Sequence, residues 1–184
     1  MLLGIGGCLA IIVIAASVER LMGRNWICKC GRIHFWVGDA GGPENSQQIA
    51  DWYSFSHIIH GFILYGVLRL VGRGRWPIVA CLLAAMMLEA GWEIIENSPV
   101  IIDRYRQTQS QDYYGDSILN SMSDITFCLI GFLIAWRIPV KWTIAMIVFM
   151  EVGVAYMIRD NLLLNIIMLI HPFESIKQWQ MNGR

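Results

Sequence analysis

Long apolar stretches alternate with shorter polar segments along this chain of 184 residues. Five of the apolar stretches contain 18 or more residues, which is enough for a helix to cross the roughly 30 Å hydrocarbon core of a bilayer. Their bounds are 1–18, 54–71, 77–96, 116–136 and 140–158. The pattern therefore predicts five transmembrane helices.

The remaining segments are too short or too polar to span. An apolar run at 161–170 is predicted to form a short interfacial or half-inserted helix that ends at Pro172. The polar segments 19–53 and 171–184 are predicted to lie outside the membrane. All five prolines fall at these boundaries or in loops, where proline does not interrupt a helix interior. The sequence therefore predicts an all-α fold: one integral-membrane domain, 1–184, built as a bundle of about five spans plus a short interfacial C-terminal helix.

The composition excludes several classes of protein. Hydrophobic residues make up 56% of the chain and charged residues 15%, against about 25% charged in a typical soluble domain. This excess of apolar side chains excludes a soluble enzyme and a disordered regulator. The 14 basic residues balance the 14 acidic ones, so no net charge would attract a nucleic acid. The expected partner is the lipid bilayer, while the oligomeric state stays open.

The charges flanking the predicted spans indicate an orientation. The short loops after the second and fourth spans contain basic residues and no acids: Arg69, Arg73, Arg75, Arg137 and Lys141. Short basic loops face the cytoplasm by the positive-inside rule. Four basic residues just after the first span (Arg20, Arg24, Lys29 and Arg32) favour the opposite orientation. We predict a multi-pass protein of the bacterial inner membrane with a cytoplasmic N-terminus.

Ionisable residues inside the predicted spans are concentrated toward one side of the membrane. The ionisable ones are His57, His60, Glu89, Glu93, Glu96, Asp116 and Asp124, with the polar Asn120 among them. Glu151 follows in the fifth span, and Arg159 and Asp160 lie directly after it. Within each of the second, third and fourth spans the spacing is three or four residues, so each set shares one helix face. Because isolated ionisable groups in a bilayer cost several kcal/mol by most estimates, these faces should converge. We predict a polar pocket walled by Trp92, Tyr113 and Tyr114.

Three interpretations of such a pocket remain open. Imidazole and carboxylate ligands bind zinc, iron or manganese, and the candidate divalent-metal ligands are His57, His60, Glu93 and Asp116. Crowded carboxylates also have split pKa values, and the candidates for catalytic acid–base chemistry are Glu93, Glu96, Asp116 and Asp124. The third possibility is a structural network in which the acids pair with arginines, for which Arg104, Arg106 and Arg159 are available.

The functional hypothesis combines this pocket with its neighbours. Arg104 and Arg106 would bind an anionic head group, with Asn120 and Trp92 completing a substrate-binding site. Glu89, Asn120 and Asp124 would position the reacting groups. The protein would then be an envelope enzyme acting on a lipid or lipid-linked substrate, and the alternative is a non-catalytic accessory protein. Whether it is an enzyme at all stays open.

Cys28 and Cys30 form a second feature, outside the predicted spans. A disulfide across one residue is strained, so a thiol pair for metal binding or redox exchange is one interpretation. The other interpretation is a disulfide to another chain.

Several short strings resemble an uncharacterised family of polytopic bacterial inner-membrane proteins, over nearly the whole chain. They are ICKCG (27–31), ENSQ (44–47), ADWY (50–53), SHIIHG (56–61), WEIIEN (92–97), RYR (104–106), DYYGDS (112–117) and RDNL (159–162). The third and fourth spans are also similar to VanZ-like proteins, whose pattern would be carried here by Glu93 or Glu96, Arg104 or Arg106, Asp116, Asn120 and Gly131. That resemblance implies a cell-envelope role near lipid or peptidoglycan chemistry.

Overall fold

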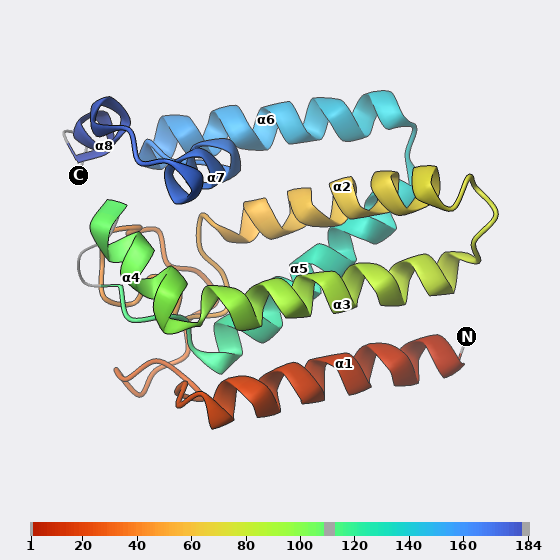
Figure 1. Cartoon of the computed structure of the whole chain (residues 1–184), viewed down its shortest axis with the longest axis horizontal. Coiled ribbons are helices and arrows are strands. Elements are labelled where there is room, and N and C mark those ends of the chain that lie inside the picture. Colours follow the sequence, from red (N-terminus) through yellow and green to blue (C-terminus); the bar gives the residue numbers. More distant parts are fainter. Residues whose placement is uncertain (1, 109–112, 182–184) are drawn as a thin grey trace.

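The computed structural model describes residues 2–108 and 113–181. Met1, Asp112 of the DYYGDS string and the last three residues of the predicted tail lie outside the described residues. The regular elements in the described part are all helices (Figure 1). They are α1 (Leu2–Leu21), α2 (Ser54–Val71), α3 (Ile78–Glu96), α4 (Pro99–Thr108), α5 (Ile118–Arg137), α6 (Val140–Ile158), α7 (Leu162–Ile170) and α8 (Glu174–Met181). The all-α prediction is confirmed.

Five of these helices match the predicted spans. By length and composition, α1, α2, α3, α5 and α6 could each cross a membrane. The fourth of them begins two residues later than predicted, because Ser117 is the N-cap of α5 and its hydroxyl accepts the Asn120 backbone N–H (3.1 Å). The short helix α7 also matches its prediction and is capped by Asn161 in the same way (2.8 Å).

Two short helices, α4 and α8, differ from the prediction. Residues 97–115 are expected to be a polar connection, with Pro99 marking the end of the preceding helix. In the structure Pro99 begins α4 instead, since proline is favoured at a first helical turn, where its missing N–H has no partner to lose. The expected tail after Pro172 likewise forms α8.

Helix α5 lies at the centre of the bundle. Half of its spanning segment is buried, whereas α1 and α6 each bury only 17% and lie at the periphery. Three clusters of buried side chains attach α5 to its neighbours. They are Ala15, Met86, Ala90 and Ile125; Ile59, Phe62, Ala135 and Met150; and Leu68, Cys81, Ala85 and Phe132. Because α5 contacts all the other long helices, its polar first turns lie against α2 and α3.

Two glycines bring α2 and α5 close together. A Cβ atom at Gly61 would overlap the carbonyl oxygen of Cys128, and one at Gly131 would overlap that of Ile58. Only glycine allows such an approach, since every other residue carries a Cβ. This crossing fixes the position of the first half of α2, which carries both predicted histidines.

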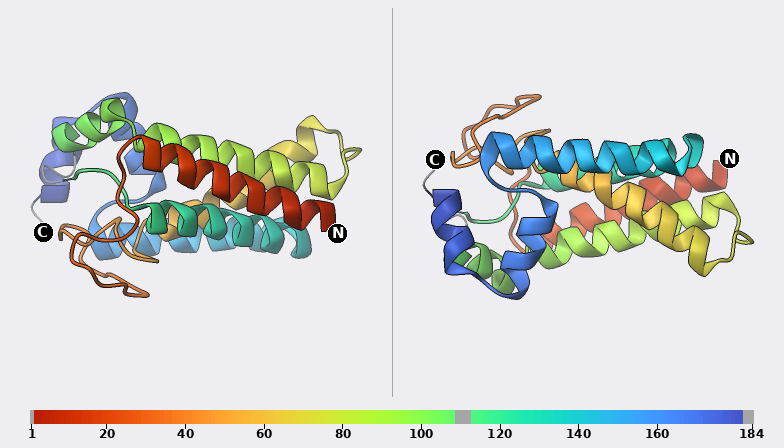
Figure 2. Two further views of the ribbon diagram at one scale, coloured as in Figure 1. Left: turned by 90° about the horizontal axis from the view of Figure 1, so that it is seen from below. Right: turned by 90° about the horizontal axis from the view of Figure 1, so that it is seen from above.

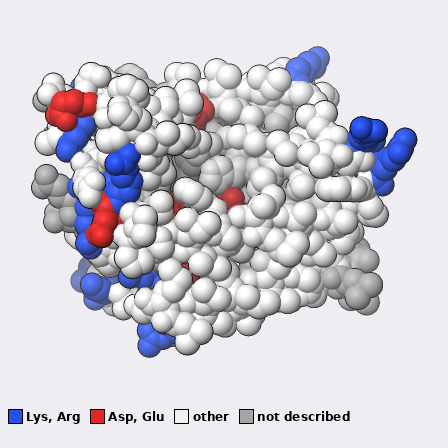
Figure 3. All heavy atoms as spheres, viewed as in Figure 1, with Lys and Arg blue, Asp and Glu red and all other residues white. Residues whose placement is uncertain are grey.

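The two ends of the bundle differ in structure. The N-terminus lies at one end, while the loop at 22–53 gathers with α4, α7 and α8 at the other (Figures 1 and 2). Charged side chains also gather at the ends, and the band between them is almost free of charge on the visible face (Figure 3). The starts of α2 and α5 and the end of α3 all meet at the loop-rich end. The predicted polar residues of these three helices therefore converge there.

Candidate functional site

Two histidines on α2 share one carboxylate on α3. His57 Nδ1 lies 2.7 Å from Glu89 Oε1, and His60 Nδ1 lies 3.0 and 3.1 Å from the two oxygens of the same side chain. His57 and Glu89 are buried, and His60 is partly exposed. The spacing of three residues places both imidazoles on one face of α2, so a single carboxylate can reach both.

Two further carboxylates surround His57. Glu93 Oε1 lies 3.3 Å from its Nδ1, and Asp124 Oδ2 of α5 lies 3.8 Å from its Nε2. The Ser54 hydroxyl also donates to Asp124 Oδ1 (3.3 Å). Neither oxygen of the fully buried Glu93 has a hydrogen-bond partner among the described residues. A buried carboxylate without hydrogen bonds is costly, and among the described residues the His57 ring is the one group that forms an ion-pair contact with it.

The separations of 3.0, 3.1 and 3.3 Å in this cluster also fit ligands of one metal ion, whereas the 2.7 Å between His57 Nδ1 and Glu89 Oε1 is a hydrogen-bond length. Two atoms bound at about 2.1 Å in tetrahedral or octahedral geometry lie roughly 3.0–3.4 Å apart. Among the described residues, three groups have donor atoms close enough together to hold an ion. Two of them lie here, namely His57, His60 and Glu89, and His57, Glu93 and Glu96, while the third is Cys28, Cys30 and Glu44 in the loop. Of the four predicted ligands, His57, His60 and Glu93 lie in this region. Asp116 belongs to neither group.

Asp116 lies instead in a hydrogen-bonded network around Asn97. The Asn97 amide donates to Asp116 Oδ2 and to the Ser121 hydroxyl (both 3.1 Å), and its oxygen accepts the Asp116 backbone N–H (2.7 Å). The Tyr113 hydroxyl donates to Asp116 Oδ1 (2.8 Å). Burial raises the pKa of Asp116 from 3.8 to about 7, the nearby Asp51 adds to this rise, and the hydrogen bonds from Tyr113 and Asn97 oppose it.

Glu96 is held by a tyrosine from α4. The Tyr105 hydroxyl donates to Glu96 Oε1 (2.8 Å) and lies 3.1 Å from the Asn165 side-chain oxygen on α7. Burial, together with the charge of Glu96, raises the pKa of Tyr105 above its ordinary value. The hydroxyl therefore stays protonated and available as a donor. Tyr105 thus connects Glu96 at the end of α3 to the short helices α4 and α7.

The loop before α2 supplies buried polar groups that sequence reasoning missed. The Asp51 carboxylate accepts the backbone N–H groups of Ser46 (2.9 Å) and Tyr53 (2.8 Å). The Gln48 carbonyl accepts from the Asn120 side chain (3.0 Å), and the Ser117 hydroxyl donates to the Gln47 carbonyl (2.9 Å). These bonds anchor the loop to the start of α5. The sequence signals here are the run of polar residues before the predicted second span and the family-like strings ENSQ (44–47) and ADWY (50–53).

A cavity of about 230 Å³ opens beside these groups. Its lining includes the polar side chains His57, His60, Glu96, Asp116, Asn120 and Asp124, together with Trp92 and Tyr113. On another side it is lined by Leu162 and Ile166 of α7. Most of the predicted pocket residues thus meet around one cavity with polar and apolar lining side chains. Glu89 and Glu93 are not among its lining residues, and Tyr114, expected beside them, lines a separate hollow.

The predicted arginines lie elsewhere. Arg104 donates to the carbonyl groups of Leu169 (3.0 Å) and Ile170 (3.1 Å) at the end of α7. Arg106 donates to the Tyr113 carbonyl (2.6 Å) and pairs with Asp103, while Arg159 donates to the Trp179 carbonyl (3.0 Å). Within the described residues, none of the three forms an ion pair with a cluster carboxylate. Neither Arg104 nor Arg106 is among the cavity-lining residues.

Glu151 also has a local role. Its two carboxylate oxygens accept the backbone N–H groups of Leu162 and Leu163 (both 3.1 Å). A carboxylate in this position satisfies N–H groups that have no partner inside the helix. Glu151 therefore stabilises the start of α7 rather than joining the histidine cluster.

The family model described as "Protein of unknown function (DUF2585)" matches residues 20–182. The chain belongs to this family. A UPF0314 protein from Rhizobium johnstonii is 53% identical over 94% of this chain and 89% of the relative. UPF0314 proteins from Brucella anthropi (51% identical; 94% and 87% coverage) and Sphingopyxis alaskensis (49% identical; 95% and 93%) are also similar. No solved structure matches the chain.

The DUF2585 match covers the whole candidate site. Residues 20–182 include the loop that carries the cysteine pair, both histidines and all the cavity-lining side chains. The predicted membership of an uncharacterised bacterial family is confirmed. The arguments about what the site does therefore rest on its geometry.

Proposed function

We propose that this DUF2585 member is an envelope-membrane enzyme that uses a divalent metal ion on a lipid or lipid-linked substrate. The observation that carries the proposal is the Glu89 carboxylate, which is shared by two histidines that line an amphiphilic cavity. Two imidazoles and one carboxylate form a common ligand set for zinc and iron, and leave coordination positions open for water or substrate.

His57, His60 and Glu89 are the proposed ligands. Their donor atoms lie close enough together to bind one ion, and a cation there would also compensate the charge of Glu93. Iron, zinc and manganese all accept such ligands. A bound ion of this kind lowers the pKa of its water and polarises an ester or phosphoryl oxygen. This chemistry suits hydrolysis or transfer at a lipid head group.

Carboxylates beside the ligands would handle protons. Glu93 and Asp124 lie within 3.3 and 3.8 Å of His57, on opposite nitrogens of its ring. Glu96 and Asp116 lie farther along the cavity wall, each hydrogen-bonded to a tyrosine. General acid–base catalysis needs one protonated and one ionised group, and different surroundings provide that difference.

The shape of the cavity supports an amphiphilic substrate. Its polar wall would accept a head group, and the α7 wall (Leu162 and Ile166) would contact an acyl or prenyl chain. The outer side of α7 is also apolar, with Leu163 and Ile170 strongly exposed. Such a helix suits the membrane interface, where a lipid could enter from the side. Asn120 and Trp92 remain proposed substrate contacts.

The proposed orientation places the cavity at the periplasmic surface of the inner membrane. The loops after α2 and α5 lie at the opposite end. These loops and the helix ends beside them carry five basic residues and no acid: Arg69, Arg73, Arg75, Arg137 and Lys141. Short basic loops remain in the cytoplasm, so the N-terminus would be cytoplasmic as well. Accessibility of a cysteine introduced at the exposed Ser175 of α8 to an impermeant maleimide in intact spheroplasts tests this orientation.

Metal analysis of purified full-length protein tests the metal assignment. We expect about one equivalent of zinc, iron or manganese per chain, and at least about a tenfold loss in Glu89→Gln and His60→Ala. Matched controls are Glu174→Gln and His171→Ala, because both side chains are exposed and remote from the cluster. Equal metal content in all five proteins would overturn the assignment.

Turnover of lipid tests the reaction. The protein would be incubated with vesicles of bacterial envelope lipid, with and without added metal, and the products measured by mass spectrometry. We expect metal-dependent loss of one lipid class in the wild type and none in Glu89→Gln. A protein that retains metal but changes no lipid would contradict the substrate class.

A second candidate function is that of a non-catalytic accessory protein. It is favoured by the network around Asn97, whose side-chain amide makes four hydrogen bonds to neighbouring side chains and backbone. Such networks hold helices together. If Glu89→Gln and His60→Ala lose stability but the wild type binds no metal, this candidate gains support.

A further inference from the structure

The disulfide between Cys28 and Cys30 bridges two cysteines that are separated by a single residue. Disulfides that stabilise a fold close long loops, because their effect on the unfolded chain grows with the number of residues enclosed. A bond across one residue leaves the rest of the chain almost unconstrained. The pair therefore contributes little to the stability of the fold. Its reactivity toward thiols is the property that points to a function.

The two sulfur atoms have different surroundings. Cys28 is buried, with 4% of its surface exposed, whereas Cys30 is an exposed residue. The backbone N–H of Cys30 donates to Cys28 Sγ (3.1 Å). An attacking thiolate would therefore meet Cys30, and the hydrogen bond would stabilise negative charge on Cys28 as the leaving group.

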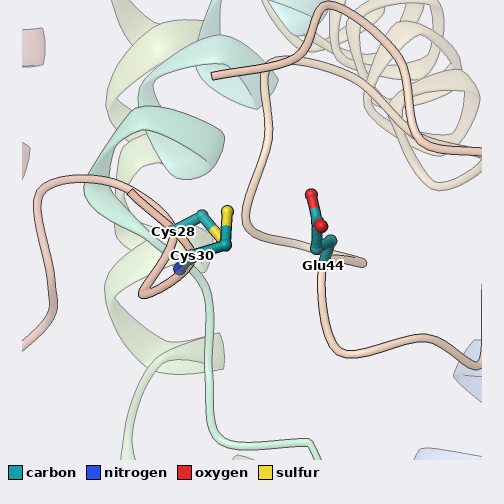
Figure 4. Close-up of side chains that lie close together, drawn as sticks. All are labelled: Cys28, Cys30 and Glu44. Carbon is teal, nitrogen blue, oxygen red and sulfur yellow. Dashed lines mark hydrogen bonds between the residues drawn. A yellow bond between two sulfur atoms is a disulfide. The ribbon is translucent and has the colours of Figure 1, made fainter. Parts of the chain in front are cut away.

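A buried glutamine fixes the exposed sulfur. Gln48 is 1% exposed, and its amide nitrogen donates to Cys30 Sγ (3.5 Å) and to Glu44 Oε2 (2.8 Å). Its amide oxygen accepts the His34 backbone N–H (2.8 Å). Figure 4 shows the two cysteines side by side, with Glu44 on a facing part of the same loop. The pair is thus held in a defined position rather than on a free loop end.

We propose that Cys28 and Cys30 form a thiol–disulfide exchange site whose substrate is a dithiol. One substrate thiolate attacks Cys30 Sγ and forms a mixed disulfide, while the Cys28–Cys30 bond breaks and Cys28 takes the electron pair and a proton. The second substrate thiolate then attacks the substrate sulfur of that mixed disulfide and releases Cys30, which is protonated in turn. The dithiol loses two electrons and two protons, and the cysteine pair gains them. This site is independent of the proposed lipid chemistry.

A redox titration of the full-length protein tests the proposal. Cys8, Cys81 and Cys128, which are free, would be replaced by alanine so that only the pair reacts. The protein would be equilibrated at graded ratios of reduced to oxidised glutathione, quenched with acid and labelled with a maleimide of high mass. We expect a reversible change from no label to two labels within these ratios. A pair that stays unlabelled at every ratio, or reduced protein that holds stoichiometric zinc through these thiols, would overturn the proposal.

Single substitutions test which sulfur is attacked. In Cys28→Ser the exposed Cys30 remains, and it should form a lasting mixed disulfide with glutathione because no second thiol resolves it. In Cys30→Ser the buried Cys28 should react at least about tenfold more slowly. Equal rates in the two variants, measured on protein that retains the wild-type melting temperature, would contradict the assignment of Cys30 as the attacked sulfur.

Discussion

Gly131 of α5 packs directly against the backbone of Ile58 on α2, so closely that a Cβ atom at Gly131 would overlap the Ile58 carbonyl oxygen. Ile58 follows the metal-ligand candidate His57 in the chain, so the contact sets the position of the histidine cluster. We expect Gly131→Ala to destabilise the fold by roughly 1–3 kcal/mol, because the helices must separate to admit the methyl group. Thermal unfolding in detergent would measure the loss.

Gly66 and Gly153 provide matched controls for this prediction. Gly66 lies on α2 itself and Gly153 on α6, and a Cβ atom at either would meet nothing within 4 Å. Alanine at these positions should leave the melting temperature unchanged or raise it slightly, since alanine has the higher helix propensity. A Gly131→Ala protein as stable as the two controls would show that the helices separate without cost.

Metal removal should lower stability if His57, His60 and Glu89 bind an ion. An ion present at 100 times its dissociation constant stabilises the native state by about 2.7 kcal/mol. A chelator should therefore lower the melting temperature of the wild type, and returning the metal should restore it. His60→Ala should melt at the temperature of the chelator-treated wild type, whether or not the chelator is present. A chelator effect of equal size in both proteins would place the ion elsewhere.

The buried Asp116 predicts a pH dependence of stability. Its pKa is raised from 3.8 to about 7, so the folded protein retains a proton that the unfolded chain has lost. Stability should fall as the pH rises from about 4 to about 7, because the native state binds more protons in this interval. Asp51, Glu96 and Tyr113 also face this carboxyl group. Asp116→Asn should flatten this part of the curve, measured by thermal unfolding between pH 4 and pH 8.

The outcome for Asp51→Asn provides a comparison. Burial raises the pKa of Asp51 also, against the hydrogen bonds from Ser46, Tyr53 and Ser54 that oppose the rise. This substitution should flatten the curve as well and also weaken the loop, since an amide cannot accept as strongly as a carboxylate. If neither variant changes the slope between pH 4 and pH 7, then other groups bind the protons.

Helical periodicity explains why much of the fold and the cluster could be predicted. His57 and His60, or Glu89 and Glu93, share a helix face whatever the tertiary structure is, and their cost in a bilayer requires those faces to meet. The choice among carboxylates could not be predicted in this way. Asp116 was expected beside the histidines, but it lies before α5 and is bound by the Asn97 amide.

The loops and short helices were less predictable for a different reason. The partners of Gln48 depend on the path of a long loop, and no local pattern encodes that path. Helix α4 is short and polar, so it lacks the apolar repeat that identifies a span. The sequence alone therefore favours Arg104 as a ligand for a head group, whereas in the structure its guanidinium donates to the backbone of α7.

That placement of Arg104 makes α7 the element most open to a direct test. Its side chain donates to the last carbonyl groups of the helix, those of Leu169 and Ile170, which have no partner inside it. Arg104→Ala should remove about 1–2 kcal/mol of local stability, which corresponds to roughly tenfold faster amide exchange across α7. Hydrogen exchange followed by mass spectrometry would measure this change.

Arg106→Ala is the control for this last prediction, because Arg106 contacts Asp103 and Tyr113 and makes no contact with α7 among its described hydrogen bonds. Its effect should be confined to α4 and to the backbone at Tyr113. Since Leu162 and Ile166 form the apolar wall of the cavity, loosening α7 in Arg104→Ala should also speed the entry of an amphiphile. If the amides of α7 exchange at the wild-type rate in Arg104→Ala, then Glu151 and packing are enough to hold the helix without the arginine.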